Sequence, residues 1–263
     1  MKLWIQLPSQ RGKSKIQFRP YLDIVGRFKR PDTEVSFQSV PPGPGISSLE
    51  SFGHYGIRFL NDREILRNVR RAPEEGYDGA IIACYFDPAL RAARQLLSMP
   101  VVGIAEASML LAGLMGLRFA VVTSDQRYLD DMVETIHLYG MASRAIGIRP
   151  VRAVDMDEGQ FLSCLGGSFA PLVEDFTQVA NGCIQDGAQV IIAGCGLMSP
   201  ALTQAGLSQV GEAPVIDPVI AAIKVTEMMV DMKRAGFPVV SRMGIYGEIP
   251  PDTLEGAVSS GLL

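Results

Sequence analysis

The sequence predicts an α/β protein with two pseudo-symmetric lobes, each a parallel sheet flanked by helices, and a functional cleft between them. Short apolar runs alternate with segments of helical spacing along most of the chain, a pattern typical of parallel sheets with right-handed crossovers. The apolar runs are continuous, which indicates strands that are covered on both faces. One strand–turn–helix segment occurs twice, and this repeat predicts two similar halves.

Each strand and helix follows from the local pattern of apolar and polar residues. In the first part of the chain, we expect strands at 2–7, 33–40, 79–84 and 100–104 and helices at 52–75 and 87–97. In the second part, we expect strands at 119–124, 143–151, 189–195 and 214–217 and helices at 106–116, 125–139, 157–186, 200–208 and 218–235. Gly166 and Gly167 are expected to interrupt the longest of these helices.

The internal repeat is the most informative feature of the sequence. DGAIIACYFDPAL (78–90) matches GAQVIIAGCGLMSPAL (187–202), because each has a strand ending in IIA, a cysteine, a turn and then Pro-Ala-Leu. The two copies lie too far apart for a solenoid repeat, so a duplicated α/β unit fits better. Cys84 and Cys195 therefore occupy equivalent positions in two similar halves.

Composition narrows the class of protein. The chain has 263 residues, with 24 Lys and Arg against 28 Asp and Glu, and its net charge of −4 argues against a nucleic-acid-binding scaffold. Hydrophobic residues make up 48%, the profile of a folded globular chain. The first residues lack the apolar core of a secretory signal, and no apolar stretch is long enough for a membrane span. We therefore expect a cytoplasmic location, where thiols stay reduced.

Both repeated cysteines fall where ligands bind in parallel sheets, at the carboxyl ends of strands. Asp87 after Cys84, and Ser199 after Cys195, are each followed by proline and are expected to cap the next helix. A helix N-terminus favours an oxyanion and lowers the pKa of a nearby thiol. A single cysteine in such a run is usually a small buried hydrophobe, but a duplicated thiol at matching positions favours acid–base chemistry.

Other polar residues give weaker signals. Cys164 and Cys183 lie in helical segments without a partner motif, and we expect both to be structural. None of the four cysteines is spaced as CxxC, and His54 and His137 have no clustered acidic partners, so no metal site is expected. Nor is there a glycine-rich frame for a nucleotide. Asp217, like Asp87, is expected to cap a helix.

Two longer stretches resemble a known family. IIACYFDPALRAARQLLSMPVVGIAEASMLLA contains a Cys-x-x-Asp-Pro turn, and VIIAGCGLM contains Gly-Cys-x-x-Met. On these residues the chain resembles the aspartate/glutamate/hydantoin racemase superfamily, and within it the hydantoin and allantoin racemase branch. The resemblance implies two α/β lobes, formed by 1–104 with 218–263 and by 105–217. It also implies one catalytic cysteine from each lobe and no cofactor.

The resemblance and the strand-end loops together indicate which residues bind the substrate. The expected catalytic residues are Cys84 and Cys195, and the expected substrate-binding residues are Pro8, Ser9, Pro42, Gly43, Tyr85, Phe86, Thr123, Ser124, Gly196 and Leu197. Glutamate racemases carry Cys-Asn-Thr and Gly-Cys-Thr-His at the two cysteines, whereas this chain has Cys-Tyr-Phe and Gly-Cys-Gly-Leu. Glutamate is therefore not the expected substrate.

Three functions stay open from the sequence. The first is a racemase or epimerase that uses two thiols at a carbon next to a carbonyl, acting on a hydantoin- or allantoin-like cyclic ureide or an amino-acid derivative. The second is a cis–trans isomerase or decarboxylase of a small dicarboxylate, which needs one catalytic thiol. The third is a two-lobed binding protein without catalysis. The expected partner is a small molecule rather than nucleic acid or membrane, and apolar helices at 106–116 and 218–235 suggest a homo-oligomer.

Overall fold

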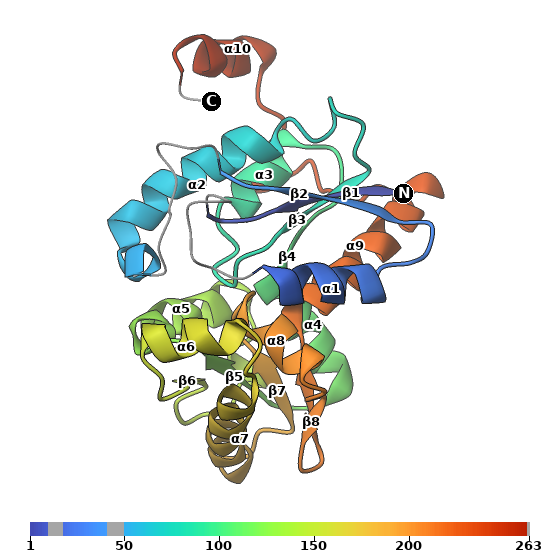
Figure 1. Ribbon diagram of the computed structural model, residues 1–263. Coiled ribbons are helices and arrows are strands. Elements are labelled where there is room, and N and C mark those ends of the chain that lie inside the picture. Colours follow the sequence, from blue (N-terminus) through green and yellow to red (C-terminus); the bar gives the residue numbers. More distant parts are fainter. Residues whose placement is uncertain (10–17, 41–49, 262–263) are drawn as a thin grey trace.

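A computed structural model describes residues 1–9, 18–40 and 50–261 of the chain. Figure 1 shows two lobes, one above the other, each built around its own sheet. The first sheet has the order β2-β1-β3-β4 and is parallel throughout. Its strands are β1 (Lys2–Gln6), β2 (Glu34–Gln38), β3 (Gly79–Ile82) and β4 (Val101–Gly103).

The second sheet has the order β6-β5-β7-β9-β8. Its strands are β5 (Phe119–Thr123), β6 (Val151–Ala153), β7 (Val190–Ala193), β8 (Gln209–Val210) and β9 (Ala213–Ile216). All neighbouring pairs are parallel except β8 with β9. The central strands β3, β5 and β7 are buried along their whole length, as continuous apolar runs predict. The predicted α/β class, with two parallel sheets, is confirmed.

Helices cover both sheets. Those of the upper part are α1 (Arg19–Phe28), α2 (Tyr55–Val69) and α3 (Leu90–Leu96). Those of the lower part are α4 (Ile104–Met115), α5 (Leu129–Leu138), α6 (Glu158–Leu165), α7 (Ala170–Gln185) and α8 (Met198–Gln204). Short 3-10 turns occur at Glu50–Gly53, Gln126–Tyr128, Ala142–Arg144 and Gly244–Tyr246. Within the described ranges, no helix combines the length and apolar character needed to cross a membrane.

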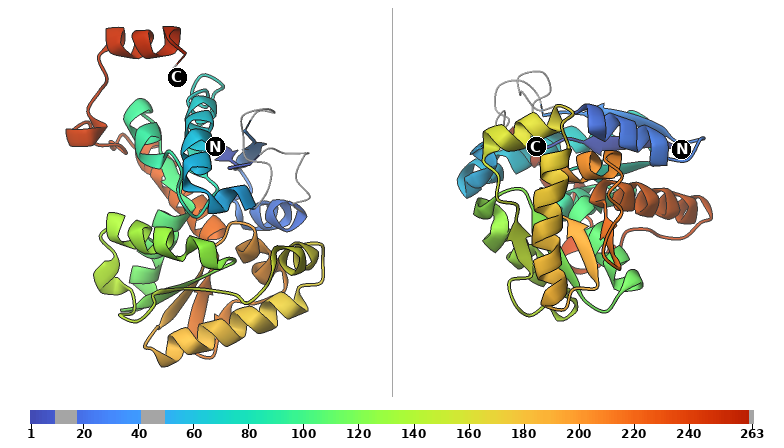
Figure 2. Two further views of the ribbon diagram at one scale, coloured as in Figure 1. Left: turned by 90° about the vertical axis from the view of Figure 1, so that its left-hand side faces the viewer. Right: turned by 60° about the horizontal axis from the view of Figure 1, so that its bottom comes forward.

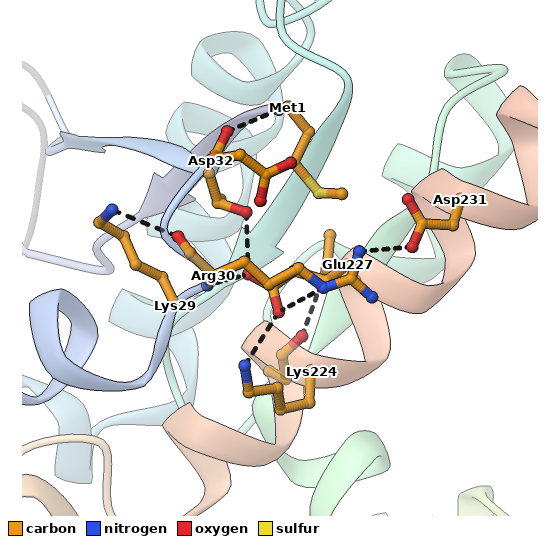
Figure 3. Close-up of polar contacts among 10 residues, drawn as sticks. Met1, Lys29, Arg30, Asp32, Lys224, Glu227 and Asp231 are labelled. Carbon is orange, nitrogen blue, oxygen red and sulfur yellow. Dashed lines mark hydrogen bonds and ion pairs between the residues drawn. The ribbon is translucent and has the colours of Figure 1, made fainter.

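Helix α9 (Pro218–Arg234) follows the last strand of the second sheet but packs on the first sheet, against β3 and β4. Its Glu227 is fully buried and accepts hydrogen bonds from the backbone N–H of Arg30 (2.7 Å) and from the Thr33 hydroxyl (2.9 Å). The ammonium of Lys224 donates to the same carboxylate at 3.1 Å, and the Arg30 guanidinium reaches Asp231 (Figure 3). This polar cluster fastens α9 to the turn between α1 and β2.

The end of the chain also returns to the first lobe. Arg242 donates to the carbonyl oxygens of Gln95 (3.0 Å) and Leu97 (2.8 Å), beside the end of α3. Helix α10 (Pro251–Ser259) then lies beyond the first lobe on this side (Figures 1 and 2). Directly after α10, the carbonyl of Gly261 accepts a hydrogen bond from the Arg63 guanidinium on α2. The lobe boundaries expected at 104 and 217 stay a prediction.

Several local predictions are wrong for identifiable reasons. Residues 143–151 do not form the expected strand: a 3-10 turn is followed by an isolated bridge at Ala145, and β6 begins only at Val151. The reason is that Arg149 has a positive φ of 42°, which interrupts the extended backbone. The helix expected from Asp87 begins at Leu90, since Asp87 and Ala89 both have positive φ. Helix α1 was not expected. The break at Gly166–Gly167 is confirmed, as α6 ends at Leu165 and α7 begins at Ala170.

Candidate active site

Cys84 and Cys195 line one cavity of about 70 Å³ between the two sheets. Cys84 lies two residues beyond the end of β3, and Cys195 lies two residues beyond the end of β7. Both thiols are free of disulfide bonds. The repeat therefore places its two cysteines on the walls of a common space, one from each lobe.

Most of the predicted binding residues line this same cavity. They are Pro8, Ser9, Tyr85, Phe86, Thr123, Ser124, Gly196 and Leu197. Pro42 and Gly43 lie outside the described residues. The loops after β1, β3, β5 and β7 thus meet at the cavity, as expected for the carboxyl ends of parallel strands.

Sequence reasoning missed an aromatic part of the lining. Phe18, Tyr21, Phe52 and Tyr128 also face the cavity, as does the aliphatic Met132. The rings of Phe86 and Tyr128 meet edge to face at 5.3 Å. Tyr21 lies on the unexpected helix α1, and Tyr128 lies in a 3-10 turn after β5, so only the rule that strand-end loops converge could have pointed to Tyr128.

The Cys84 thiol is nine-tenths buried, and burial raises its pKa to about 12. The backbone N–H of Phe86 opposes this shift, whereas negative charge on Cys195, Asp87 and Asp62 adds to it. The prediction that a helix N-terminus lowers this pKa is therefore wrong for Cys84. The physical reason is that α3 begins only at Leu90, and desolvation outweighs a single N–H contact. Cys84 is a neutral thiol at physiological pH.

Asp87 caps a helix, but not the one expected. Its carboxylate accepts from the backbone N–H groups of Ala105 (3.0 Å) and Glu106 (2.9 Å), which open α4, and from the Tyr139 hydroxyl at 2.7 Å. Its own N–H donates to the carbonyl of Cys84 at 2.9 Å. Asp87 therefore fixes the turn that carries Cys84 to the first turn of α4.

The second half has a comparable carboxylate. Asp217 accepts from the N–H of Val219 (2.9 Å) at the start of α9, which confirms its predicted capping role. Ser199 was expected to be an N-cap but lies inside α8, and its hydroxyl donates to Asp217 at 3.0 Å. Asp217 thus joins α8, directly after the Cys195 turn, to α9.

The two hydroxyls after β5 differ in their contacts. Thr123 is fully buried, and its hydroxyl donates to the carbonyl of Gly194 at 3.1 Å. In this conformation Thr123 joins the β5 and β7 loops rather than offering its proton to a ligand. Ser124 is only half-buried and also lines the cavity. In the described part of the chain, no group of three or more His, Cys, Asp or Glu side chains is arranged to hold a metal ion.

Comparisons with known proteins show which family the chain resembles. A family model described as Asp/Glu/hydantoin racemase matches residues 44–226. A hydantoin racemase from Pseudomonas sp. (strain NS671) is 32% identical over 208 residues, which cover 78% of this chain and 77% of the relative. Allantoin racemase from Klebsiella pneumoniae has a TM-score of 0.78 at 29% identity, covering 95% of this chain and 94% of that one.

A more distant structure shares the fold alone. Unliganded arylmalonate decarboxylase has a TM-score of 0.52 at 14% identity, covering 87% of this chain and 92% of that one. The family model and the hydantoin racemase relative each cover well over half of the chain, including both cysteine turns. The chain therefore belongs to the Asp/Glu/hydantoin racemase family.

Proposed function

We propose that the protein is a cofactor-independent racemase that inverts a carbon next to a carbonyl by proton transfer between Cys84 and Cys195. The observation that carries this proposal is that both thiols, from equivalent positions of the two halves, line one cavity. Inversion needs an acid and a base on opposite faces of the carbon. A duplicated fold supplies one group from each wall.

In the proposed reaction, one cysteine acts as a thiolate and removes the hydrogen as a proton. The electron pair of the broken C–H bond moves into the adjacent carbonyl group to give an enolate. The thiol of the other cysteine then delivers its proton to the opposite face, and the carbonyl re-forms. Backbone N–H groups in the two cysteine turns and the Ser124 hydroxyl stabilise the charge on the enolate oxygen.

The substrate that the cavity supports best is a hydantoin- or allantoin-like cyclic ureide. Six of the 18 described lining residues are aromatic, which suits a flat ring. The described lining includes no arginine or lysine to bind the carboxylate of a free amino acid. The relatives named hydantoin racemase and allantoin racemase support the same class. A cyclic amino-acid derivative of similar shape would also fit this chemistry.

Hydrogen exchange in D₂O tests the two-thiol reaction. We expect Cys84→Ser and Cys195→Ser each to lose racemisation, because a serine hydroxyl is a poor base at neutral pH. Each variant should still exchange the hydrogen of one enantiomer for deuterium, and the two variants should act on opposite enantiomers. ¹H NMR of each pure enantiomer, incubated with each variant, measures this exchange.

The same experiment separates the one-thiol alternatives. If one single variant keeps full racemase activity, its cysteine is structural. A reaction that uses one catalytic thiol then becomes the better interpretation. If the protein instead turns over a small dicarboxylate and only one of the two variants loses that activity, a decarboxylase or cis–trans isomerase is favoured. If both variants exchange the same enantiomer, the two thiols share a face and the two-base mechanism fails.

The remaining properties belong to the same proposal. We propose a cytoplasmic homo-oligomer that acts on a small molecule and binds neither nucleic acid nor membrane. The net charge of −4 supports the absence of nucleic-acid binding. The exposed apolar side chains of Leu110 and Leu114 on α4 support a homo-oligomer. Size-exclusion chromatography with light scattering measures the oligomeric state.

A further inference from the structure

A second and larger cavity lies beside the one that holds the two thiols. Its volume is about 640 Å³, against about 70 Å³ for the inner cavity. The two cavities share Pro8, Phe52, Cys84 and Phe86 in their walls. Helix α2 of the upper lobe and helix α5 of the lower lobe form the other walls, on the same side of the molecule (Figure 1). We call this space the outer cavity.

The inner cavity is too small for the whole of a substituted ureide. A volume of 70 Å³ has room for on the order of five water molecules, at ~15 Å³ for each. The five-membered ring of a ureide, with its two carbonyl oxygens, fills such a space. A substituent on the reacting carbon therefore needs room elsewhere, and the outer cavity opens directly beside Cys84.

Phe86 lines both cavities, and Arg58 lines the outer cavity beside it. The Arg58 guanidinium lies over the Phe86 ring, 4.2 Å from its centre. Arg58, on α2, also forms an ion pair with Asp131 on α5, which ties the two lobes together beside the cavity. Only 13% of its side chain is exposed, so its geometry is set by packing rather than by solvent. Among the described residues, its Nε–H is buried without a hydrogen-bond acceptor.

A buried guanidinium N–H without an acceptor is unfavourable, and a ligand oxygen would relieve that cost. The substituent that binds most favourably is therefore one that extends beyond the ring and carries a carbonyl oxygen to accept this hydrogen bond, such as an amide or ureido group. A purely aliphatic substituent of the same shape would fill the space but leave the N–H unpaired.

Resting on the proposed function, we infer that the outer cavity holds the substituent on the reacting carbon and that Arg58 is a specificity-determining residue, which selects substituents bearing a hydrogen-bond acceptor. Phe86 separates this subsite from the ring-binding cavity, and the stack with Arg58 holds the Phe86 ring in place. Inversion moves the hydrogen from one face to the other while the substituent stays near the plane of the enolate. One subsite therefore serves both enantiomers.

The test compares two substrates of nearly equal shape. 5-(2-Carbamoylethyl)hydantoin carries an amide, and 5-(3-methylbutyl)hydantoin replaces that amide with an isosteric hydrocarbon. We expect the wild-type protein to prefer the amide at least tenfold in kcat/KM. Arg58→Met should reduce this preference to less than threefold. Arg58→Lys should do the same, since it retains the ion pair with Asp131 but has no N–H at the Nε position.

Arg67→Met is the matched control. Arg67 lies on the same helix, pairs with Glu64 at 3.6 Å and lines neither cavity, so the preference should be unchanged in this variant. A merely structural role for Arg58 would lower kcat/KM for both substrates by the same factor. The ratio between substrates is therefore the informative quantity.

Failure of the inference is distinguishable from failure of the proposed function. Racemisation of 5-methylhydantoin by the wild-type protein tests the function alone, because its substituent does not reach the outer cavity. If that substrate is racemised but the amide preference is absent, or survives in both Arg58 variants, the assignment of the outer cavity is overturned. If no ureide is racemised, the proposed function falls, and the subsite falls with it.

Discussion

Replacing Asp87 with asparagine should abolish a loss of stability that the wild-type protein suffers as the pH rises toward neutral, although Asp87 caps a helix. Burial raises the pKa of this carboxyl to about 7 from 3.8, while the N–H groups of Glu106 and Ala105 and the Tyr139 hydroxyl hold it down only in part. The folded protein therefore binds the Asp87 proton more tightly than the unfolded chain does. The stability from the neutral carboxyl is fully present below pH 3.8 and is lost as the pH rises through about 7.

The size of the effect follows from the two pKa values. Each pKa unit corresponds to ~1.4 kcal/mol, so a rise from 3.8 to about 7 amounts to roughly 4 kcal/mol in total. Most of this difference develops above pH 5. Between pH 5 and pH 8 the wild-type protein should lose on the order of 2–3 kcal/mol that the variant keeps. Asparagine has the size of the protonated acid, but its NH2 group cannot accept the hydrogen bonds that the second carboxyl oxygen accepts. That loss is the same at every pH, so the pH dependence of the difference between the two proteins is the informative quantity.

Urea denaturation at pH 5, 6, 7 and 8 measures the free energy of unfolding of both proteins. Asp252→Asn, on the exposed helix α10, controls for the general removal of one negative charge. A difference between Asp87→Asn and wild type that stays constant over this range would refute the reasoning. It would mean that the Asp87 carboxyl is better solvated than its burial of 94% suggests.

Two further predictions follow from the burial of polar groups. Iodoacetamide at pH 7.5 should label the half-buried Cys195 before Cys84, because the raised pKa of Cys84, about 12, leaves little thiolate. The labelling rate of Cys84 should rise about tenfold for each pH unit. Peptide mass spectrometry measures the labelling, and equal labelling of the two cysteines would contradict the prediction. Glu227→Ala should lower the free energy of unfolding by about 3–5 kcal/mol, because it leaves the Arg30 N–H and the Thr33 hydroxyl unpaired beside Lys224. Urea denaturation measures this loss, and a change below about 1 kcal/mol would show that water replaces the carboxylate.

Much of the architecture could be predicted because it depends on local patterns. The strands around β3, β5 and β7 are continuous apolar runs, and the repeat identified both cysteines as equivalent strand-end residues. Convergence of the carboxyl ends then predicted that Ser9, Tyr85, Ser124 and Gly196 lie around one space, and the structure brings them together.

The parts that failed depend on contacts between distant segments. Asp87 followed by proline has the sequence of an N-cap, but its partners are the N–H groups of Ala105 and Glu106, which the sheet brings close. The positive φ of Asp87 and Ala89 is likewise set by this contact rather than by residue type. Arg58 gave no signal in the sequence, since its neighbours Phe86 and Asp131 come from the two different lobes.

The same long-range contacts make two equivalent cysteines chemically different. Cys84 lies near the carboxyl groups of Asp62 and Asp87 and is buried, so in the free protein it holds its proton. Within the proposed mechanism, Cys84 therefore starts as the proton donor, and it becomes a base only after the substrate has entered and changed its surroundings. The equilibrium constant between two enantiomers is one, which forces kcat/KM to be equal in both directions. The asymmetry of the thiols must therefore appear in kcat and KM separately: the enantiomer whose hydrogen faces Cys84 should have the lower kcat and, in proportion, the lower KM.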